Sequence, residues 1–150
     1  MNTGVIGVGK MGLSHLAIAR QTKGINLIAF AEKSGFLCKS IAKATGISAY
    51  SNYKKMVETE NLDAVIICVP NWLHAEVAMF CVSRGINFFI EKPFTLDYET
   101  SKNIAEEAQK ENLFGQVGYV NRANLLFEKA RELIESKAIG EVYSYSCEMT

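Results

Sequence analysis

Apolar and polar positions follow two different periods along this chain. Short runs rich in β-branched and aromatic residues lie at 3–8, 25–31, 48–50, 62–69, 86–90 and 113–120. Between them, apolar residues recur three and four positions apart at 11–22, 35–45, 53–58, 73–84 and 98–111. Strands that alternate with amphipathic helices predict βαβ units. We therefore expect an α/β fold, with a doubly wound parallel sheet and helices on both faces.

Helical spacing also selects the side chains expected to face the core. These are Leu13, Leu16 and Ala17, then Leu37, Ile41 and Ala44, then Leu73, Val77, Phe80 and Cys81, and finally Ser101, Ala105 and Ala108. Gly24 and Gly46 follow the first two helices and are expected to end them, because glycine accepts the left-handed backbone that often closes a helix.

The last thirty residues depart from this rhythm. A helix is predicted at 124–137, with Leu126, Ala130, Leu133 and Ile134 facing inward, and one long strand at 141–150. A lone strand exposes both edges and needs partners. We therefore expect a nucleotide-binding domain at 1–120, and at 121–150 the crossover helix and first strand of a second domain, as in the front part of a longer protein.

The composition of the chain limits the kinds of partner that it is expected to bind. The 150 residues are 49% hydrophobic, and 16 basic residues balance 16 acidic ones, so neither a nucleic-acid groove nor an anionic membrane surface is expected. The chain has neither a membrane-length apolar run nor a secretory leader, which favours a cytoplasmic protein. Its four cysteines lack metal-ligand spacing and are expected to be reduced thiols, with no metal site.

The pattern Gly7-x-Gly9-x-x-Gly12 follows the first strand directly and opens a helix. In that context the first glycine allows a tight turn, the second lets the backbone approach a diphosphate, and the third lets helix and strand pack closely. The motif predicts a dinucleotide cradle. The alternatives are a glycine-rich turn that binds nothing and a site for S-adenosylmethionine.

An acidic residue, Glu32, ends the second strand twenty positions after Gly12. A carboxylate there accepts hydrogen bonds from ribose hydroxyls and repels a 2′-phosphate, which favours NAD over NADP. Lys33 and Ser34 follow it directly, and both are able to hold a phosphate, so NADP stays open. Glu32 and Lys33 are also open to the simpler interpretation of a solvated pair.

Two further motifs follow strand ends, where ligands bind in open α/β sheets. In Pro70-Asn71-Trp72-Leu73-His74, Asn71 is able to cap the next helix, Trp72 to shield a nicotinamide or cover a strand end, and His74 to serve either packing or function. In Glu91-Lys92-Pro93, a lysine in the crevice is able to polarise a hydroxyl or carbonyl, whereas the alternative is a strand that simply reaches the surface.

Together these motifs resemble the amino-terminal half of the Gfo/Idh/MocA family of oxidoreductases. The resemblance rests on the glycine motif, Pro70-Asn71 with His74, Glu91-Lys92-Pro93, Gly118-Tyr119 with Asn121-Arg122, and Ile139-Gly140-Glu141-Val142. It covers essentially the whole chain. Members of the family are NAD(P)-dependent dehydrogenases and reductases that act mostly on sugars, inositols and sugar derivatives.

The resemblance implies a role for each matching residue. Gly7, Gly9, Lys10, Met11 and Gly12 would hold the diphosphate and Glu32 the adenosine ribose, while Asn71 and His74 would lie along the cofactor near its nicotinamide half and Glu91 beside the ribose. The other residues expected to bind the cofactor are Lys33, Pro70, Trp72 and Arg122. Lys92 would bind the cofactor and contact the reacting oxygen, and the Lys92-Pro93 bond would be cis. Relatives often follow the arginine with an aromatic residue and a proline, whereas Ala123 follows Arg122 here.

The family also sets expectations for the intact protein. A second domain supplies an aspartate, a histidine and most of the substrate pocket, and we expect a homo-oligomer that transfers a hydride between nicotinamide and a carbinol carbon. This chain alone is expected to bind NAD(H) and to turn over little substrate. The alternative from another class is a stand-alone module that senses NAD(H) without catalysis.

Overall fold

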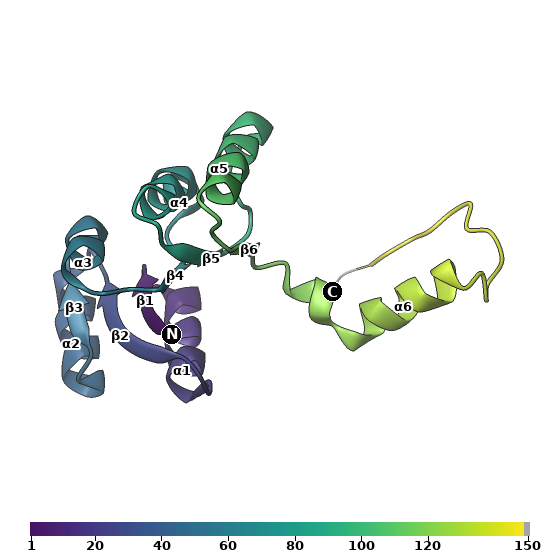
Figure 1. Ribbon diagram of the computed structural model, residues 1–150. Helices are drawn as coiled ribbons and strands as arrows, with labels where there is room; N and C mark the ends of the chain where they lie inside the picture. The colour runs from purple at the N-terminus through teal and green to yellow at the C-terminus, as the bar shows by residue number, and fades with distance from the viewer. Residues whose placement is uncertain (149–150) are drawn as a thin grey trace. The chain divides into compact units, whose positions relative to one another are not determined.

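The computed structural model describes residues 1–148, and its first part is a six-stranded parallel sheet (Figure 1). The strands are β1 (Asn2–Ile6), β2 (Asn26–Ala31), β3 (Ser48–Tyr50), β4 (Ala64–Ile67), β5 (Asn87–Ile90) and β6 (Gly115–Val117). Their order is β3-β2-β1-β4-β5-β6, and each neighbouring pair is parallel. The order reverses between β1 and β4, so the expected doubly wound sheet is confirmed.

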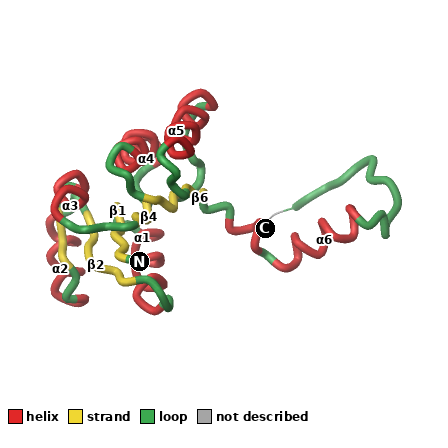
Figure 2. Tube along the Cα trace, viewed as in Figure 1, coloured by secondary structure: helices red, strands yellow, loops and turns green. Residues whose placement is uncertain are grey.

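Helices connect successive strands of this sheet (Figure 2). They are α1 (Lys10–Gln21), α2 (Gly35–Thr45), α3 (Tyr53–Thr59), α4 (His74–Val82) and α5 (Tyr98–Lys110), with a short 3-10 turn, η1 (Asn71–Leu73), before α4. These bounds lie within a few residues of the predicted ones, because strand and helix ends depend on local hydrogen bonds that apolar periodicity does not record.

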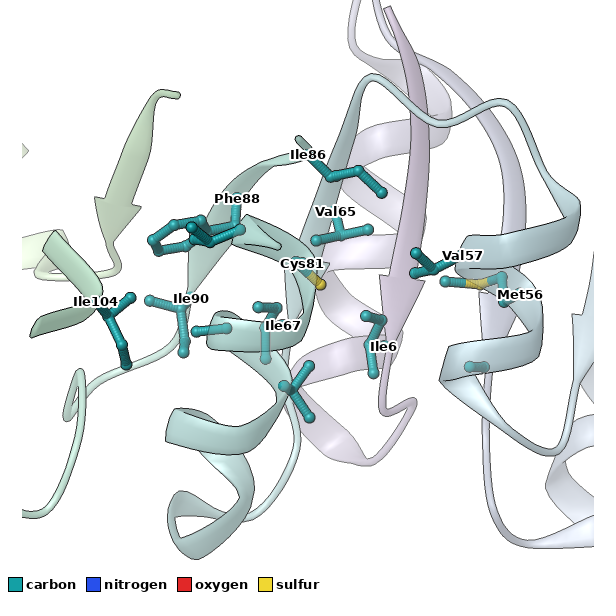
Figure 3. Close-up of a cluster of buried hydrophobic side chains, with 14 of the residues drawn as sticks. Ile6, Met56, Val57, Val65, Ile67, Cys81, Ile86, Phe88, Ile90 and Ile104 are labelled. Carbon is teal, nitrogen blue, oxygen red and sulfur yellow. The ribbon is translucent and has the colours of Figure 1, made fainter. Parts of the chain in front are cut away.

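The sheet buries one apolar cluster on each face. Ile6, Ile67 and Ile90 belong to the larger cluster, which α3, α4 and α5 cover, and Figure 3 shows them near Cys81 of α4. The smaller cluster includes Phe30 and is covered by α1 and α2. A fully buried side chain of this size contributes about 2 kcal/mol through removal of apolar surface from water.

Some helix faces differ from the predicted ones. Leu13, Ala17, Ala44 and Ala105 were expected inward but are exposed, whereas Ile104 is fully buried. Alanine and leucine recur so often in these helices that several stripes fit the sequence, and the packing partner decides among them. Gly46 ends α2 in the left-handed conformation as expected, but the residue that closes α1 is Thr22, ahead of Gly24.

Residues from Tyr119 onward form a second compact unit. It contains η2 (Val120–Ala123) and α6 (Leu125–Glu135), which begins where the Asn124 side chain accepts a hydrogen bond from the Leu126 amide. The residues expected to face inward on α6 are all exposed. No strand forms in residues 141–148, which is a correction: an extended segment needs a neighbouring strand to form a ladder. The rest of that predicted strand lies outside the described residues.

Across residues 1–148, none of the helices combines the length and the apolar character that a bilayer crossing requires.

Candidate cofactor site

The glycine loop joins the carboxyl end of β1 to α1. Gly7 has φ +85°, a conformation that favours glycine, and a Cβ there would lie 2.8 Å from the Cys68 carbonyl oxygen. A Cβ on Gly12 would lie only 1.9 Å from the Gly7 carbonyl oxygen, so Gly12 lets α1 pack against the loop. A Cβ on Gly9 would meet no atom within 4 Å, so the space beside Gly9 is open.

The start of α1 fits an anion. Gly9 is the N-cap and has no side chain to accept the first amides of the helix, and no acidic residue lies in the first turn. Lys10 and Met11, the first two helical residues, are exposed. Free amides, the positive end of the helix dipole and the open space beside Gly9 together provide what a diphosphate requires.

Glu32 lies just beyond β2, and its carboxylate is fixed by two backbone amides. The Val8 amide donates to Oε2 at 2.9 Å, and the Ser34 amide donates to Oε1 at 2.8 Å. Glu32 therefore ties the glycine loop to the end of β2, a role that the sequence did not indicate. Each carboxylate oxygen keeps a further acceptor position for a ribose hydroxyl.

A cleft of about 630 Å³ opens beside this carboxylate, a size typical of small-molecule sites. Its lining includes five residues of the glycine loop and the later motifs, Gly7, Glu32, Lys33, Pro70 and Trp72. Three strand ends, those of β1, β2 and β4, thus contribute to one cleft, as their common parallel direction requires.

The same cleft contains a cluster that the sequence reasoning missed. The Tyr53 hydroxyl donates to Glu76 Oε1 at 2.8 Å, and Lys54 Nζ lies 3.1 Å from the same oxygen. The Tyr53 hydrogen bond and then Lys54 hold the pKa of Glu76 below its ordinary value. The available signal was the position of Tyr53 and Lys54 just after β3, a third strand that ends at this edge of the sheet.

The Pro70-Asn71-Trp72 segment is exposed. Trp72 is 72% exposed, so it does not cover a strand end, and with Pro70 it lines the cleft. The expectation that the Asn71 side chain caps the following helix is wrong. The N-cap of α4 is Leu73, without a side-chain hydrogen bond, because η1 intervenes and its Asn71 carbonyl accepts the His74 amide.

His74 is fully buried, and its proposed contact with the cofactor stays a prediction. Its Nδ1 lies 2.6 Å from the Pro93 carbonyl oxygen, and its Nε2 lies 3.0 Å from that of Val69. The ring thus links the end of β4 to the loop after β5.

Glu91 and Lys92 differ in exposure although they are neighbours. Glu91 is buried, and its Oε1 lies 2.7 Å from Nε2 of His15 on α1, while Lys92 is exposed. The Lys92-Pro93 peptide is cis, as the resemblance implied. A buried charge next to an exposed cation at a strand end fits a reaction site better than a strand that simply surfaces.

Arg122 belongs to the second unit, where its guanidinium lies 5.7 Å from the centre of the Tyr119 ring. It borders a small hollow of about 270 Å³ together with Phe127 and Arg131. Its proposed contact with the cofactor stays a prediction.

The parallel sheet, the glycine loop against α1 and the acidic residue after β2 define a Rossmann domain of the dinucleotide-binding class. The family model described as "Oxidoreductase family, NAD-binding Rossmann fold" matches residues 1–119. The chain therefore belongs to the Gfo/Idh/MocA oxidoreductase family.

Relatives and solved structures agree with this assignment. Inositol 2-dehydrogenase of Corynebacterium glutamicum is 32% identical over 145 residues, which is 95% of this chain and 43% of the relative. Myo-inositol 2-dehydrogenase of Lactobacillus plantarum superposes with a TM-score of 0.87 at 27% identity, covering 95% of this chain and 43% of that one. Scyllo-inositol dehydrogenase of Lactobacillus casei, solved with NAD(H) and scyllo-inositol, gives 0.86 at 25%, covering 93% and 42%. The chain thus spans less than half the length of these relatives.

Proposed function

We propose that this chain is the cofactor-binding part of an NAD-dependent dehydrogenase. The enzyme would transfer a hydride between nicotinamide and a carbinol or carbonyl carbon of an inositol, a sugar or a sugar derivative. The observation that carries this proposal is the meeting of the glycine loop, Glu32 and the Glu91-Lys92 pair at one edge of the sheet.

In this proposal each part of the site contacts a different part of the cofactor or the substrate. The open backbone at Gly9 and the start of α1 hold the diphosphate, and Glu32 accepts the ribose hydroxyls. When bound, the nicotinamide supplies the site that exchanges the hydride. Lys92, which is exposed, donates a hydrogen bond to the reacting oxygen of the substrate. This hydrogen bond favours the alkoxide character that hydride loss requires.

NAD is the preferred cofactor in this proposal. The two backbone amides on Glu32 fix its negative charge where a 2′-phosphate would lie. Ser34, which is able to hold a phosphate, uses its hydroxyl to accept the Leu37 amide at the start of α2. Lys33 borders the cleft and is the residue through which NADP would still bind.

The inositol and sugar substrates are proposed from the relatives, because this chain spans less than half of their length. We propose that residues from 121 onward begin a second domain that supplies the remaining catalytic groups and most of the substrate pocket. A cytoplasmic location and a homo-oligomeric assembly of the intact protein stay predictions.

The test uses the polypeptide encoded by the complete gene, with myo-inositol, scyllo-inositol and aldoses as substrates and NADH formation as the readout. We expect NAD-dependent oxidation of at least one of them, and a loss of kcat of about a hundredfold or more in Lys92→Ala. Lys102→Ala, at an exposed surface pair on α5, is the matched control. Full activity of Lys92→Ala would contradict its role, and NAD binding without any oxidation would favour a cofactor-sensing module.

A further inference from the structure

The pair formed by His15 and Glu91 is not explained by the glycine motif or by the lysine beside it. His15 lies on α1, three residues after Gly12, and Glu91 directly follows β5. Nε2 of His15 lies 2.7 Å from Oε1 of Glu91, with side chains 18% and 11% exposed. A nearly buried acid–base pair is costly to desolvate and is expected to have a use.

The surroundings hold both members in place. The His15 ring packs against the Phe89 ring at 5.1 Å between centres, tilted by 56°. The other carboxylate oxygen of Glu91 accepts the Lys92 amide at 3.3 Å. A Cβ on Gly118 would lie 2.9 Å from the Phe89 ring and 3.5 Å from Glu91 Oε1, so the glycine after β6 leaves room for this arrangement.

The pair lies on a defined side of the crevice. A dinucleotide binds across the point where the strand order reverses, with one mononucleotide over each half of the sheet. Glu32, just beyond β2, places the adenosine half over β1, β2 and β3, so the nicotinamide half belongs over β4, β5 and β6. Glu91, at the end of β5, is on the nicotinamide side. This step rests on the proposed function.

The negative charge of Glu91 is expected to affect the oxidised and the reduced nicotinamide differently. The nicotinamide ring is cationic when oxidised and neutral when reduced, so a fixed carboxylate nearby stabilises the oxidised form selectively. Burial, and then the Glu91 charge, raises the pKa of the Cys68 thiol to about 12. The Cys68 thiol is therefore neutral at neutral pH, and Glu91 supplies the negative charge.

We propose that His15 is a positioning residue that holds the Glu91 carboxylate toward the nicotinamide side and thereby tilts the domain toward NAD⁺ over NADH. It acts through Glu91 and does not itself contact the reacting atoms. Without His15, the carboxylate turns toward water and its effect on the ring is lost.

The experiment measures the Kd of this chain for NAD⁺ and for NADH by calorimetry. In Glu91→Gln we expect the Kd for NAD⁺ to rise about fivefold, the size expected of a partly screened charge pair, while the Kd for NADH stays unchanged. His15→Ala and His15→Asn give the same change, because neither side chain reaches Glu91. His15→Gln restores the wild-type ratio, since its amide nitrogen donates from nearly the same place as Nε2.

Ser14→Ala, at an exposed neighbour on α1, is the matched control, and thermal melts establish that each variant is folded. A merely structural role for His15 would weaken NAD⁺ and NADH binding by the same factor in all three His15 variants, and that result would overturn the inference alone. Wild-type chain that binds neither nucleotide would overturn the proposed function together with this inference.

Discussion

Gly9 and Gly12 constrain the same loop for different physical reasons. A Cβ on Gly12 would overlap the backbone of the free protein, whereas a Cβ on Gly9 would project into open space. Gly9 also has φ −64° and ψ −166°, which alanine adopts without strain. Folding thus requires glycine at position 12, while only ligand binding requires it at position 9.

This difference gives a paired prediction. We expect Gly12→Ala to lower the free energy of unfolding by about 1–3 kcal/mol through overpacking. Gly9→Ala should change it by less than about 0.5 kcal/mol yet weaken NAD(H) binding by about tenfold or more, because the added methyl occupies the diphosphate position. Denaturant unfolding and calorimetry measure the two effects.

Gly35→Ala is the control, because Gly35 also has open space around it but begins α2. Equal affinity for NAD(H) in Gly9→Ala and wild type would contradict the assignment of the loop as the diphosphate cradle.

Glu32 carries the second prediction at this scale. Glu32→Gln removes the negative charge but keeps one oxygen to accept the amides of Val8 or Ser34. Because a like charge beside a 2′-phosphate is costly, we expect the ratio of NADP to NAD affinity to rise about tenfold. Titrations of both cofactors measure the ratio, with Glu111→Gln on the exposed end of α5 as the control. An unchanged ratio would show that another residue selects the cofactor.

At the scale of elements, α5 depends on one exposed cap. Asp97 accepts the Thr100 amide at 2.8 Å at the start of α5. That backbone hydrogen bond, followed by the Thr100 side chain, holds the pKa of Asp97 below its ordinary value of 3.8. A carboxyl group whose pKa is lower in the folded state stabilises the fold above its unfolded-state pKa, and this stabilisation is lost as the pH falls through the folded-state pKa.

The expected outcome is a pH-dependent difference between wild type and Asp97→Asn. Asparagine keeps the capping hydrogen bond but carries no charge to interact with the helix dipole. Wild type should therefore melt at a higher temperature near neutral pH, and the difference should disappear as the pH falls below 3.8. Circular dichroism melts over a pH series measure it, and a difference that persists undiminished in acid would exclude the charge as its source.

Strands and their connections could be predicted because each leaves a local signal. β4 and β5 are β-branched or aromatic runs, and the glycine loop follows β1 directly. The buried face of α5 could not be predicted in the same way. Ser101, Ala105 and Ala108 form one plausible stripe, but the stripe through Ile104 and Ala108 is the one that packs on the sheet.

In the candidate site, too, some residues could be predicted from local sequence signals and others could not. Strand ends predicted the positions of Glu32 and of Glu91 with Lys92, because parallel strands bring their carboxyl ends to one edge. The sequence reasoning did not find His15, since its partner lies 76 positions away and only the packing of α1 against the sheet brings the two together. The two hydrogen-bond partners of His74 were not predicted for a related reason: sequence shows its neighbours along the chain but not the carbonyls that enclose it.

At the scale of the whole molecule, the first unit contains a complete sheet with both faces covered and a cleft at its carboxyl edge. That unit holds every residue assigned to the cofactor except Arg122. Relatives are more than twice as long as this chain. Cofactor binding is therefore the property that can be tested with this chain by itself.

The most direct measurement is therefore calorimetric titration of the purified chain with NAD⁺ and NADH, accompanied by thermal melts. The account predicts saturable binding of one nucleotide per chain, a melting temperature that rises with nucleotide concentration, and weaker binding by the folded Gly9→Ala variant. Folded wild-type chain that shows neither heat of binding nor a shift in melting temperature with either nucleotide would contradict the central claim.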